Sequence, residues 1–251
     1  MLNIKAVILA AGESKRMKSA ISKLLHSINT KPTVIYPVTA CKGCGIKDII
    51  VVVGYQAEKI ISTLGDGVSY AFQPEPRGTG DALKKAIPFL EGYQGHLLIL
   101  PGDAPLINTF TLIQFINFHI EKRPALSILT AIFSNPSHYG RVIRDARNQV
   151  MKIVEYKNAT PKEKKIKEVN GGIYCMRFDI VEPFIWRLRP NKVTGEYYLT
   201  DIVELLYKKG LRIEAYVSPN PTVILGVNTP EELENVRAII SERRVRNNAT
   251  Q

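Results

Sequence analysis

Short, uninterrupted apolar runs alternate with helical patterns through the first half of the chain, and this alternation constrains the fold most. The expected strands are 5–10, 48–53, 68–72, 96–101 and 126–133. The helical patterns between them span 32–42, 56–64, 79–89 and 108–122, of which the first contains Pro37 and should be kinked or shortened by it. Strands that are apolar throughout are buried on both faces, as happens when helices cover both sides of a parallel sheet. The sequence therefore predicts an α/β fold built from βαβ units.

After about residue 134 the pattern becomes mixed. Strands are expected at 141–144, 149–155, 168–176 and 212–217, and helices at 180–187, at 199–208 and from residue 230. No low-complexity linker divides the chain, so we expect one domain over residues 1–240, with a mostly parallel, mixed sheet flanked by helices. Residues 241–251, with Arg243, Arg244 and Arg246, are expected to form a basic C-terminal tail.

Charge and hydropathy narrow the function classes. No apolar run approaches the roughly 20 residues of a membrane span. The apolar start at residues 6–11 is too short and wrongly flanked for a secretion signal, so we expect a cytoplasmic protein. The 251 residues carry a formal net charge of +11, which suggests nucleic acid, an anionic membrane face or phosphorylated small molecules as partners. The cations are spread out and lack interleaved aromatic residues, which argues against nucleic acid.

Neither the cysteines nor the histidines form a recognisable catalytic or metal-binding set. Cys41 and Cys44 have the CxxC spacing, but zinc needs four ligands and the sequence has no second pair. Gly43 and Gly45 are typical of a helix end, so we expect inert thiols. The four histidines fall at scattered positions, and no catalytic histidine is expected.

The end of the first expected strand carries the first candidate binding group. Residues 9–17 read Leu-Ala-Ala-Gly-Glu-Ser-Lys-Arg-Met. In open α/β sheets ligands bind beyond the carboxyl ends of the strands, and small residues there let backbone N–H groups reach phosphate oxygens. Arg16 offers a planar cationic fork suited to phosphate, and Lys23 adds a second cation. The segment matches neither the GxGxxG fingerprint nor the P-loop, so its signal alone is weak.

Two further strand ends carry candidate residues. Asp103 follows the strand 96–101, where carboxylates that bind Mg²⁺ in phosphoryl-transfer enzymes lie, and Mg²⁺ usually takes one or two protein ligands plus phosphate oxygens. Gln73 follows another strand and precedes Gly78-Thr79-Gly80, and an amide beside exposed glycine backbone can read a nucleobase edge. Each feature alone also fits an ordinary turn or helix cap, so the combination carries the inference.

Together and in this order, these motifs resemble those of the sugar-nucleotide pyrophosphorylases. The resemblance runs from about residue 4 to residue 240 and is strongest to the uridyltransferase half of the bifunctional N-acetylglucosamine-1-phosphate uridyltransferases, the GlmU type. The opening Leu-Ala-Ala-Gly-x-x-x-Arg-Met is shared by many nucleotidyltransferases. More specific are Gln73 with residues 78–80, Tyr139-Gly140-Arg141, Val154-Glu155-x-Lys157, Asn170-Gly171-Gly172, residues 195–201 (Gly-Glu-Tyr-Tyr-Leu-Thr-Asp) and Gly226-Val227-Asn228.

The resemblance implies a Rossmann-like nucleotidyltransferase fold, with a nucleotide-binding first half (about 1–134) and a sugar-binding second half (about 135–228). It implies a step of cell-wall biosynthesis in which UTP and N-acetylglucosamine 1-phosphate give UDP-N-acetylglucosamine and pyrophosphate, with Mg²⁺ as cofactor. It assigns nucleotide binding to Leu9, Ala11, Gly12, Lys23, Gln73, Gly78 and Thr79. It assigns sugar binding to Gly140, Glu155 and Asn170, metal binding to Asp103 and Asn228, and catalysis to Arg16 and Lys23.

The implied chemistry is coherent with these residue types. A phosphate oxygen of the sugar phosphate attacks the α-phosphorus of UTP in line, and because this oxygen is already ionised no general base is needed. Mg²⁺, Arg16 and Lys23 would offset the repulsion between the two anions and stabilise the charge on the departing pyrophosphate.

The sequence departs from the family pattern at several positions. Ser22 stands where Pro is usual, which we expect to loosen the loop before Lys23. Pro101 stands where several members have Tyr, and Asp81 where many have His. The sequence also contains none of the hexapeptide repeats of the acetyltransferase β-helix domain, so we expect neither acetyl transfer nor the β-helix trimer from this polypeptide.

Three alternatives stay open at this point. The sugar could be glucose 1-phosphate or another hexose 1-phosphate, and the base could be thymine, because a methyl-sized feature changes discrimination by only ~1–3 kcal/mol. A non-catalytic relative could keep the fold for regulation, although the cations and the metal-ligand candidates are all present. The net charge of +11 also allows an RNA-associated protein, whose binding would weaken steeply with salt.

Overall fold

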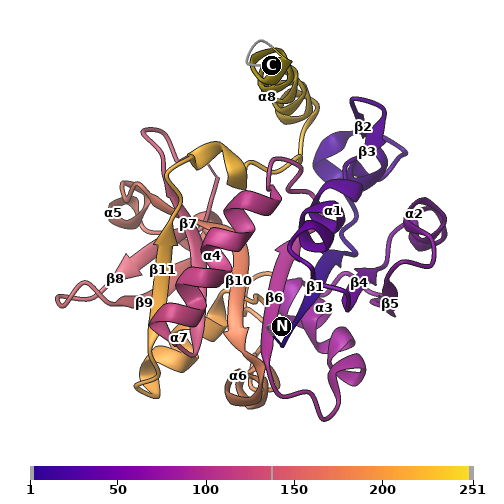
Figure 1. The fold of residues 1–251 in the computed structure, drawn as a ribbon. Helices are drawn as coiled ribbons and strands as arrows, with labels where there is room; N and C mark the ends of the chain where they lie inside the picture. The colour runs from indigo at the N-terminus through magenta and orange to yellow at the C-terminus, as the bar shows by residue number, and fades with distance from the viewer. Residues whose placement is uncertain (1–2, 137, 249–251) are drawn as a thin grey trace.

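The first four of the five apolar runs form the parallel core of a nine-stranded mixed sheet (Figure 1). The structure is a computed structural model that describes residues 3–136 and 138–248, with side chains described as far as residue 243. The strands are β1 (Ile4–Ala10), β4 (Ile49–Val53), β5 (Ser69–Phe72), β6 (His96–Pro101), β7 (Leu126–Ile132), β8 (Arg141–Arg144), β9 (Val150–Val154), β10 (Glu168–Arg177) and β11 (Ile213–Val217), with β2 (Ser27–Ile28) and β3 (Lys31–Pro32) in a separate hairpin.

The helices connect these strands and cover them. They are α1 (Ile35–Gly43), α2 (Ala57–Leu64), α3 (Thr79–Ala86), α4 (Thr109–Lys122), α5 (Pro161–Lys164), α6 (Phe178–Ile185), α7 (Asp201–Lys208) and α8 (Pro230–Asn248). Short 3-10 helices lie at η1 (Lys15–Met17), η2 (Lys23–Leu25), η3 (Ile87–Leu90), η4 (Tyr156–Asn158) and η5 (Pro221–Ile224).

Strand order places β1 at the centre of the parallel part. The order across the sheet is β11-β7-β10-β6-β1-β4-β5, with β8 paired to β10 and β9 paired to β8. β1 pairs in parallel with both β4 and β6, and β4 pairs in parallel with β5. The chain moves outward from β1 through β4 to β5 and then returns to β6 on the other side of β1, so strand order reverses there. Such a reversal is where open α/β sheets bind ligands.

Helices cover both faces of the sheet, as fully apolar strands require. Val7 of β1 faces the core formed with α3, α6 and α7, whereas Ala6 and Ile8 face the core formed with α1, α2 and α4. All three are fully buried, which follows from the period of two along a strand. Burying a side chain the size of Val or Ile contributes about 1.5–3 kcal/mol. The expected α/β fold with a mostly parallel sheet flanked by helices is therefore confirmed.

Element bounds differ from the sequence expectation mainly at prolines. The helix expected over 79–89 ends at Ala86 and continues as the 3-10 turn η3, because Pro88 has no N–H to donate to the preceding turn. The helix expected over 32–42 begins only at Ile35, so Pro37 lies in its first turn, where backbone N–H groups have no helical partner in any case.

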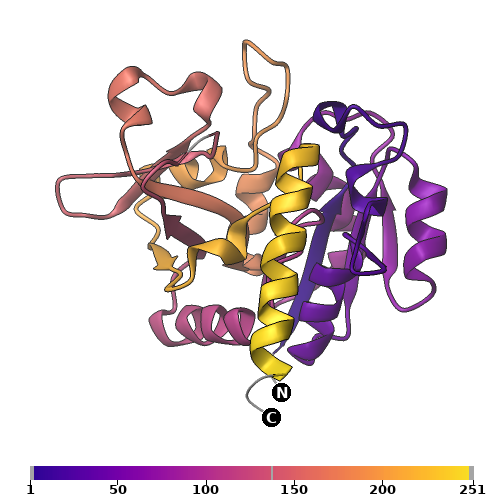
Figure 2. The ribbon, with the colours of Figure 1, turned by 90° about the horizontal axis from the view of Figure 1, so that it is seen from above.

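Helix α8 runs past residue 240, where the tail was expected to start, and continues to Asn248. Leu233 and Val236 pack against Met17 and Leu106. Figure 2 shows α8 lying between the indigo-to-magenta first half and the orange second half of the chain. The last helix therefore packs on residues from the first half of the chain.

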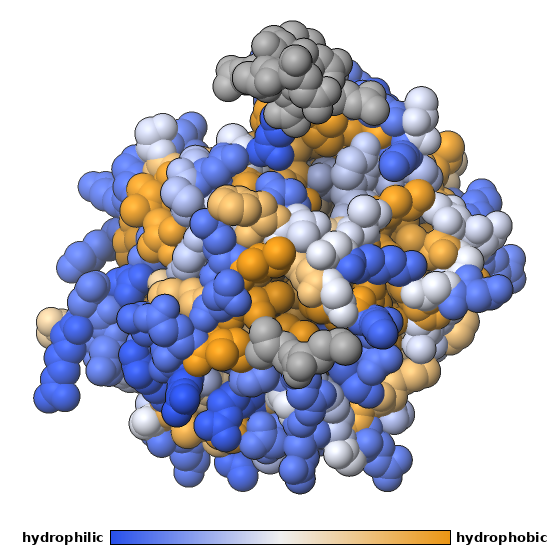
Figure 3. All heavy atoms as spheres, in the orientation of Figure 1, coloured by the Kyte–Doolittle hydropathy of each residue, from blue (hydrophilic) through white to orange (hydrophobic). Residues whose placement is uncertain are grey.

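The exposed surface is mixed in character. Hydrophilic side chains are spread around the face seen in Figure 3, with apolar side chains between them over its centre, where α4 lies in Figure 1. Phe110 and Ile113 of α4 are among the exposed apolar residues. Within the described residues, no helix combines the length and hydropathy needed to cross a membrane.

Candidate active site

The carboxyl ends of β1, β5 and β6 open into a cavity of about 450 Å³ at the point where strand order reverses. One side of the cavity is formed by the loop after β1 and the other by the second half of the chain. Of the candidate residues, those lining the cavity are Leu9, Ala11, Gly12, Lys23, Gln73, Gly78, Thr79, Asp103, Glu155 and Asn170. All the predicted nucleotide residues and two of the three predicted sugar residues therefore line one cavity.

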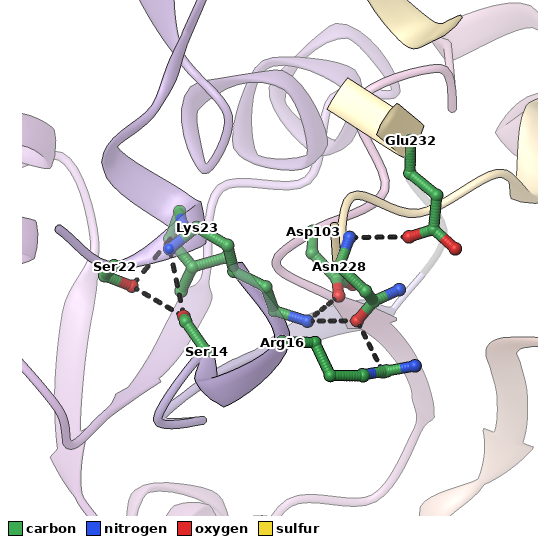
Figure 4. A network of polar contacts seen from close by, with 8 residues as sticks. Ser14, Arg16, Ser22, Lys23, Asp103, Asn228 and Glu232 are labelled. Atoms are coloured by element: carbon green, nitrogen blue, oxygen red, sulfur yellow. Dashed lines mark hydrogen bonds and ion pairs between the residues drawn. The ribbon is translucent and has the colours of Figure 1, made fainter. Parts of the chain in front are cut away.

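Next to this cavity, two cations meet two oxygen-bearing side chains (Figure 4). The Lys23 ammonium contacts the Asp103 carboxylate and donates to Asn228 Oδ1 over 2.7 Å. Arg16 Nη2 donates to the same Asn228 oxygen over 2.9 Å. The side chains of Lys23 and Asp103 are only 17% and 16% exposed, so this ion pair is screened little by solvent. Residues separated by some two hundred positions thus converge on one point.

Lys23 is held by a hydrogen-bonded loop. Its backbone N–H donates to Ser14 Oγ over 2.9 Å, and the N–H of the preceding Ser22 donates to Gln56 Oε1 over 2.9 Å. Ser22 is fully buried, and its Oγ accepts from Leu24 N and lies 3.4 Å from Ser14 Oγ. The expectation that serine in place of proline loosens this loop is therefore wrong, because the serine N–H and hydroxyl, which proline lacks, are both used.

The two candidate metal ligands are fixed through their backbones. The carbonyl of Asp103 accepts from Val227 N over 3.0 Å, which joins the two ligand-bearing loops. Asn228 N donates to Glu232 Oε2 over 2.7 Å, and Thr229 Oγ1 accepts from Glu232 N over 3.2 Å. Glu232 lies in the first turn of α8, so the helix start anchors Asn228 in place.

The donor set fits magnesium. Asp103 and Asn228 offer one carboxylate and one amide oxygen, and both already surround a single cation, the Lys23 ammonium. Mg²⁺ prefers oxygen ligands and commonly takes one or two from the protein, with phosphate and water completing its shell. Among the described residues there is no group of three or more His, Cys, Asp or Glu that could form an all-protein metal site. The site suits a metal that arrives with a phosphorylated ligand.

The loop after β1 leaves room for that ligand. A Cβ placed on Gly12 would meet no protein atom within 4 Å, so the backbone here faces open space in the cavity. Ser14 adopts a left-handed conformation with φ of 61°, which turns the chain into η1 and brings Arg16 back toward Asn228. The turn after β1 thus exposes the Gly12 backbone to the cavity and directs the Arg16 guanidinium to Asn228.

The turn between β5 and α3 is tightly packed and contains Gln73, Gly78 and Thr79. Gly78 has φ of +96°, and a Cβ there would lie 2.6 Å from the carbonyl oxygen of Tyr197, so only glycine fits. Thr79 Oγ1 accepts from Leu199 N over 3.0 Å. The predicted base-binding turn is therefore fastened to the segment around residue 197 in the second half of the chain.

Two of the three predicted sugar residues, Glu155 and Asn170, line the opposite wall. Glu155 accepts a 3.0 Å hydrogen bond from Thr200 Oγ1, and burial raises the pKa of its carboxyl, with nearby Asp201 and Glu196 acting in the same direction. Asn170 donates to the Tyr174 hydroxyl over 2.8 Å and accepts from Gly172 N over 3.0 Å. A partly buried carboxylate acceptor on the same wall as an amide suits the hydroxyl and amide groups of a sugar.

Gly140 lies just behind this wall. Its carbonyl accepts from Asn170 N over 2.9 Å. A Cβ on Gly140 would lie 3.5 Å from Glu155 Oε2 and 3.1 Å from Ile153 Cγ2. Gly140, like Arg16 and Asn228, contacts the lining residues rather than forming the cavity surface.

Sequence reasoning missed several residues that hold the site: Ser14, Thr200, Tyr174 and Glu232. For Glu232 a signal existed, since Thr-Pro-Glu-Glu at a helix start resembles a capping box. However, the Glu232 carboxylate accepts from the N–H of Asn228, one residue before the capping Thr229. No sequence rule predicts this bond.

The CxxC pair lies away from the cavity at the end of α1. Burial raises the pKa of the Cys41 thiol well above its ordinary value and that of Cys44 to about 11. Both thiols are therefore poor nucleophiles at neutral pH, as expected from their place at a helix end.

Comparison with known proteins agrees with this geometry. Residues 5–220 match the family model described as nucleotidyl transferase. The chain belongs to this family. It is 43% identical over 242 residues to the bifunctional protein GlmU of Pelotomaculum thermopropionicum, covering 96% of this chain and 53% of that one. It is 45% identical over 252 residues to GlmU of Clostridium novyi, covering 98% of this chain and 55% of that one. The nucleotidyl transferase chain thus spans about half the length of these curated relatives.

A solved structure shares the fold. It is assigned as a glucose-1-phosphate thymidylyltransferase from Bacillus anthracis, holds sucrose, and superposes with a TM-score of 0.74 over 94% of each chain at 23% sequence identity. At this identity the likeness supports the fold of the nucleotidyl transferase chain alone.

Proposed function

We propose that this nucleotidyl transferase makes UDP-N-acetylglucosamine and pyrophosphate from UTP and N-acetylglucosamine 1-phosphate. The observation that carries the proposal is the convergence of Lys23, Arg16, Asp103 and Asn228 beside the glycine turn after β1. The match to GlmU over nearly the whole chain supports the same reaction.

The reaction forms one bond and breaks one. A phosphate oxygen of the sugar phosphate bonds to the α-phosphorus of UTP, and the bond from that phosphorus to the bridging oxygen breaks, so that pyrophosphate leaves with the electron pair. The attacking oxygen is already ionised, which agrees with a cavity lined by no histidine among the described residues. Catalysis then depends on charge neutralisation and alignment.

Lys23 and Arg16 provide the neutralising charge. Their cationic groups meet at Asn228 Oδ1, and Lys23 lines the same cavity as Gly12, whose backbone faces open space. Asp103 and Asn228 would hold Mg²⁺, which when bound acts as a Lewis acid on phosphate oxygens. Once a triphosphate enters, the Lys23 ammonium can exchange its contact with Asp103 for a contact with phosphate, and so stabilise the departing pyrophosphate.

The second half of the chain would orient the sugar. Glu155 has one oxygen bonded to Thr200 and a second oxygen free to accept from a sugar hydroxyl. Asn170, fixed by Tyr174 and Gly172, lies on the same wall. We therefore propose that residues 1–134 bind the nucleotide and residues 135–228 bind the sugar. Glu155 and Asn170 would hold the sugar so that its anomeric phosphate points toward Lys23 and Arg16.

A pyrophosphate-release screen tests this function. Each common nucleoside triphosphate, including dTTP, is paired with each common hexose 1-phosphate, with Mg²⁺ and with EDTA. We expect the highest rate for UTP with N-acetylglucosamine 1-phosphate, and release near background in EDTA. A higher rate with dTTP or with glucose 1-phosphate would contradict the assigned substrates, and no release from any pair would contradict the transferase itself.

A further inference from the structure

The amide of Gln73 is held by an acidic residue that the proposed reaction does not otherwise use. Gln73 Nε2 donates to Asp81 Oδ2 over 2.8 Å and to the carbonyl of Gly78 over 3.1 Å. Gln73 is only 4% exposed and lines the cavity. Asp81 lies in the first turn of α3, directly behind the predicted base-binding turn.

These two contacts fix which end of the amide faces the cavity. A backbone carbonyl and a carboxylate are both acceptors, so the atom that faces them must be the amide nitrogen, whose two hydrogens they consume. The amide oxygen has no hydrogen-bond partner in the described part of the chain. Among the described residues, the one fully buried side-chain polar atom without a partner is His26 Nε2. The unpartnered Gln73 oxygen is therefore not fully buried. Gln73 therefore offers the cavity an acceptor and no donor.

An acceptor at this place selects among pyrimidines. Uracil and thymine carry a donor at N3, flanked by two carbonyl acceptors, whereas cytosine has an acceptor at N3. An amide free to rotate would suit either edge, because its nitrogen can donate to cytosine N3 and its oxygen can accept from uracil N3. A locked amide loses this freedom and disfavours the base that presents an acceptor.

We propose that Asp81 is a positioning residue for base selection: by holding the Gln73 nitrogen, it presents the Gln73 oxygen to the N3–H of a uracil or thymine nucleotide. The proposal rests on the function proposed above, because it assumes that the base lies against Gln73. It departs from the family resemblance, in which histidine is common at this position.

Asp81 also has a plainer role from which this one must be separated. A carboxylate in the first turn of a helix interacts favourably with the helix dipole. Its loss therefore destabilises α3, whichever ligand is bound. Loss of α3 stability would lower the affinity for UTP and CTP by the same factor. The ratio of the two affinities is therefore the informative measurement, and it does not depend on the fraction of protein that is folded.

The experiment measures equilibrium binding of UTP and CTP, each with Mg²⁺, by calorimetry on wild type, Asp81→Asn and Asp81→Ala. Asp66→Asn is the matched control, since it makes the same change at an exposed aspartate beyond the end of α2. We expect wild type and Asp66→Asn to prefer UTP equally. Asp81→Ala should lose roughly three- to tenfold of that preference, the range of one typical hydrogen bond, and Asp81→Asn, which keeps one acceptor oxygen, should lose less.

Each other outcome has a definite reading. If wild type binds UTP no more tightly than CTP, or if Asp81→Ala keeps the preference for UTP within twofold, Asp81 does not position the amide and the inference is overturned, even if both affinities fall together. If wild type binds neither nucleotide, the proposed function is overturned, and the inference with it.

Discussion

At the scale of single residues, the metal-ligand assignment makes the sharpest prediction. Asp103→Ala should lower turnover by at least about 10²–10³-fold, because it removes the only carboxylate among the two predicted Mg²⁺ ligands. The fold should survive, since Lys23 keeps its bond to Asn228. Steady-state pyrophosphate release and circular dichroism measure the two effects. Asp66→Ala serves as control, and near-normal turnover of Asp103→Ala at saturating Mg²⁺ would refute the assignment.

Glu155 allows function and stability to be separated. Because burial raises its pKa above the ordinary value of 4.5, the folded protein favours the protonated carboxyl. The stability that this gives is present below pH 4.5 and is lost as pH rises through the raised pKa, so at neutral pH the partly buried charge destabilises the fold. Glu155→Gln should therefore unfold at a higher temperature than wild type at pH 7, with the difference shrinking toward pH 4.5.

The same substitution should damage sugar binding. Glutamine can still accept from Thr200, but it is a weaker acceptor for a sugar hydroxyl than a carboxylate is. We expect KM for N-acetylglucosamine 1-phosphate to rise about tenfold, with KM for UTP changed less than twofold. Equal rises in both constants would remove Glu155 from the sugar wall, and lower stability at pH 7 would contradict the buried-charge argument.

At the scale of elements, the start of α8 is a part of the site that lies outside the cavity. Glu232 binds the backbone N–H of Asn228, so Glu232→Ala should release the loop that carries this ligand. We expect a loss of about 1 kcal/mol in unfolding free energy and a several-fold higher Mg²⁺ requirement. Glu234→Ala, at an exposed position on the same helix, is the control. If both variants need the same Mg²⁺ concentration, the helix start does not position Asn228.

The elements also show what the sequence could and could not predict. Strands buried on both faces, such as β1 and β4, were predicted within a residue because their pattern is local. The antiparallel placement of β10 between β6 and β7 was not predicted, since pairing direction depends on the path of the whole chain.

A similar division holds in the site. Asp103 and Gln73 could be found because they follow predicted strands, at the edge where ligands bind. The bonds of Gln73 to Asp81 and of Glu155 to Thr200 could not, because they depend on side-chain rotamers set by tertiary packing. Ser22 illustrates the limit most clearly: a residue expected to loosen its loop is fully buried, donates to Gln56 and accepts from Leu24 N.

At the scale of the whole molecule, the site joins the two ends of the chain. Arg16 and Lys23 lie in the segment after β1, whereas Asn228 lies just before α8. The carbonyl of Asp103 accepts from Val227 N, beside Asn228, and so joins the two segments. A ligand that binds this point bridges segments that separate on unfolding, so it should stabilise the folded state as a unit.

Thermal unfolding with UTP and Mg²⁺ tests this coupling. A ligand at one hundred times its Kd adds about 2.7 kcal/mol of stability, which for a chain of this size corresponds to a rise of roughly 5–10 °C in Tm. With EDTA the rise should be much smaller, because only Lys23 and Arg16 then offset the triphosphate charge. A single shifted transition is expected, since the bound residues span both halves. An equal rise with and without Mg²⁺ would show that the triphosphate binds without a metal between Asp103 and Asn228.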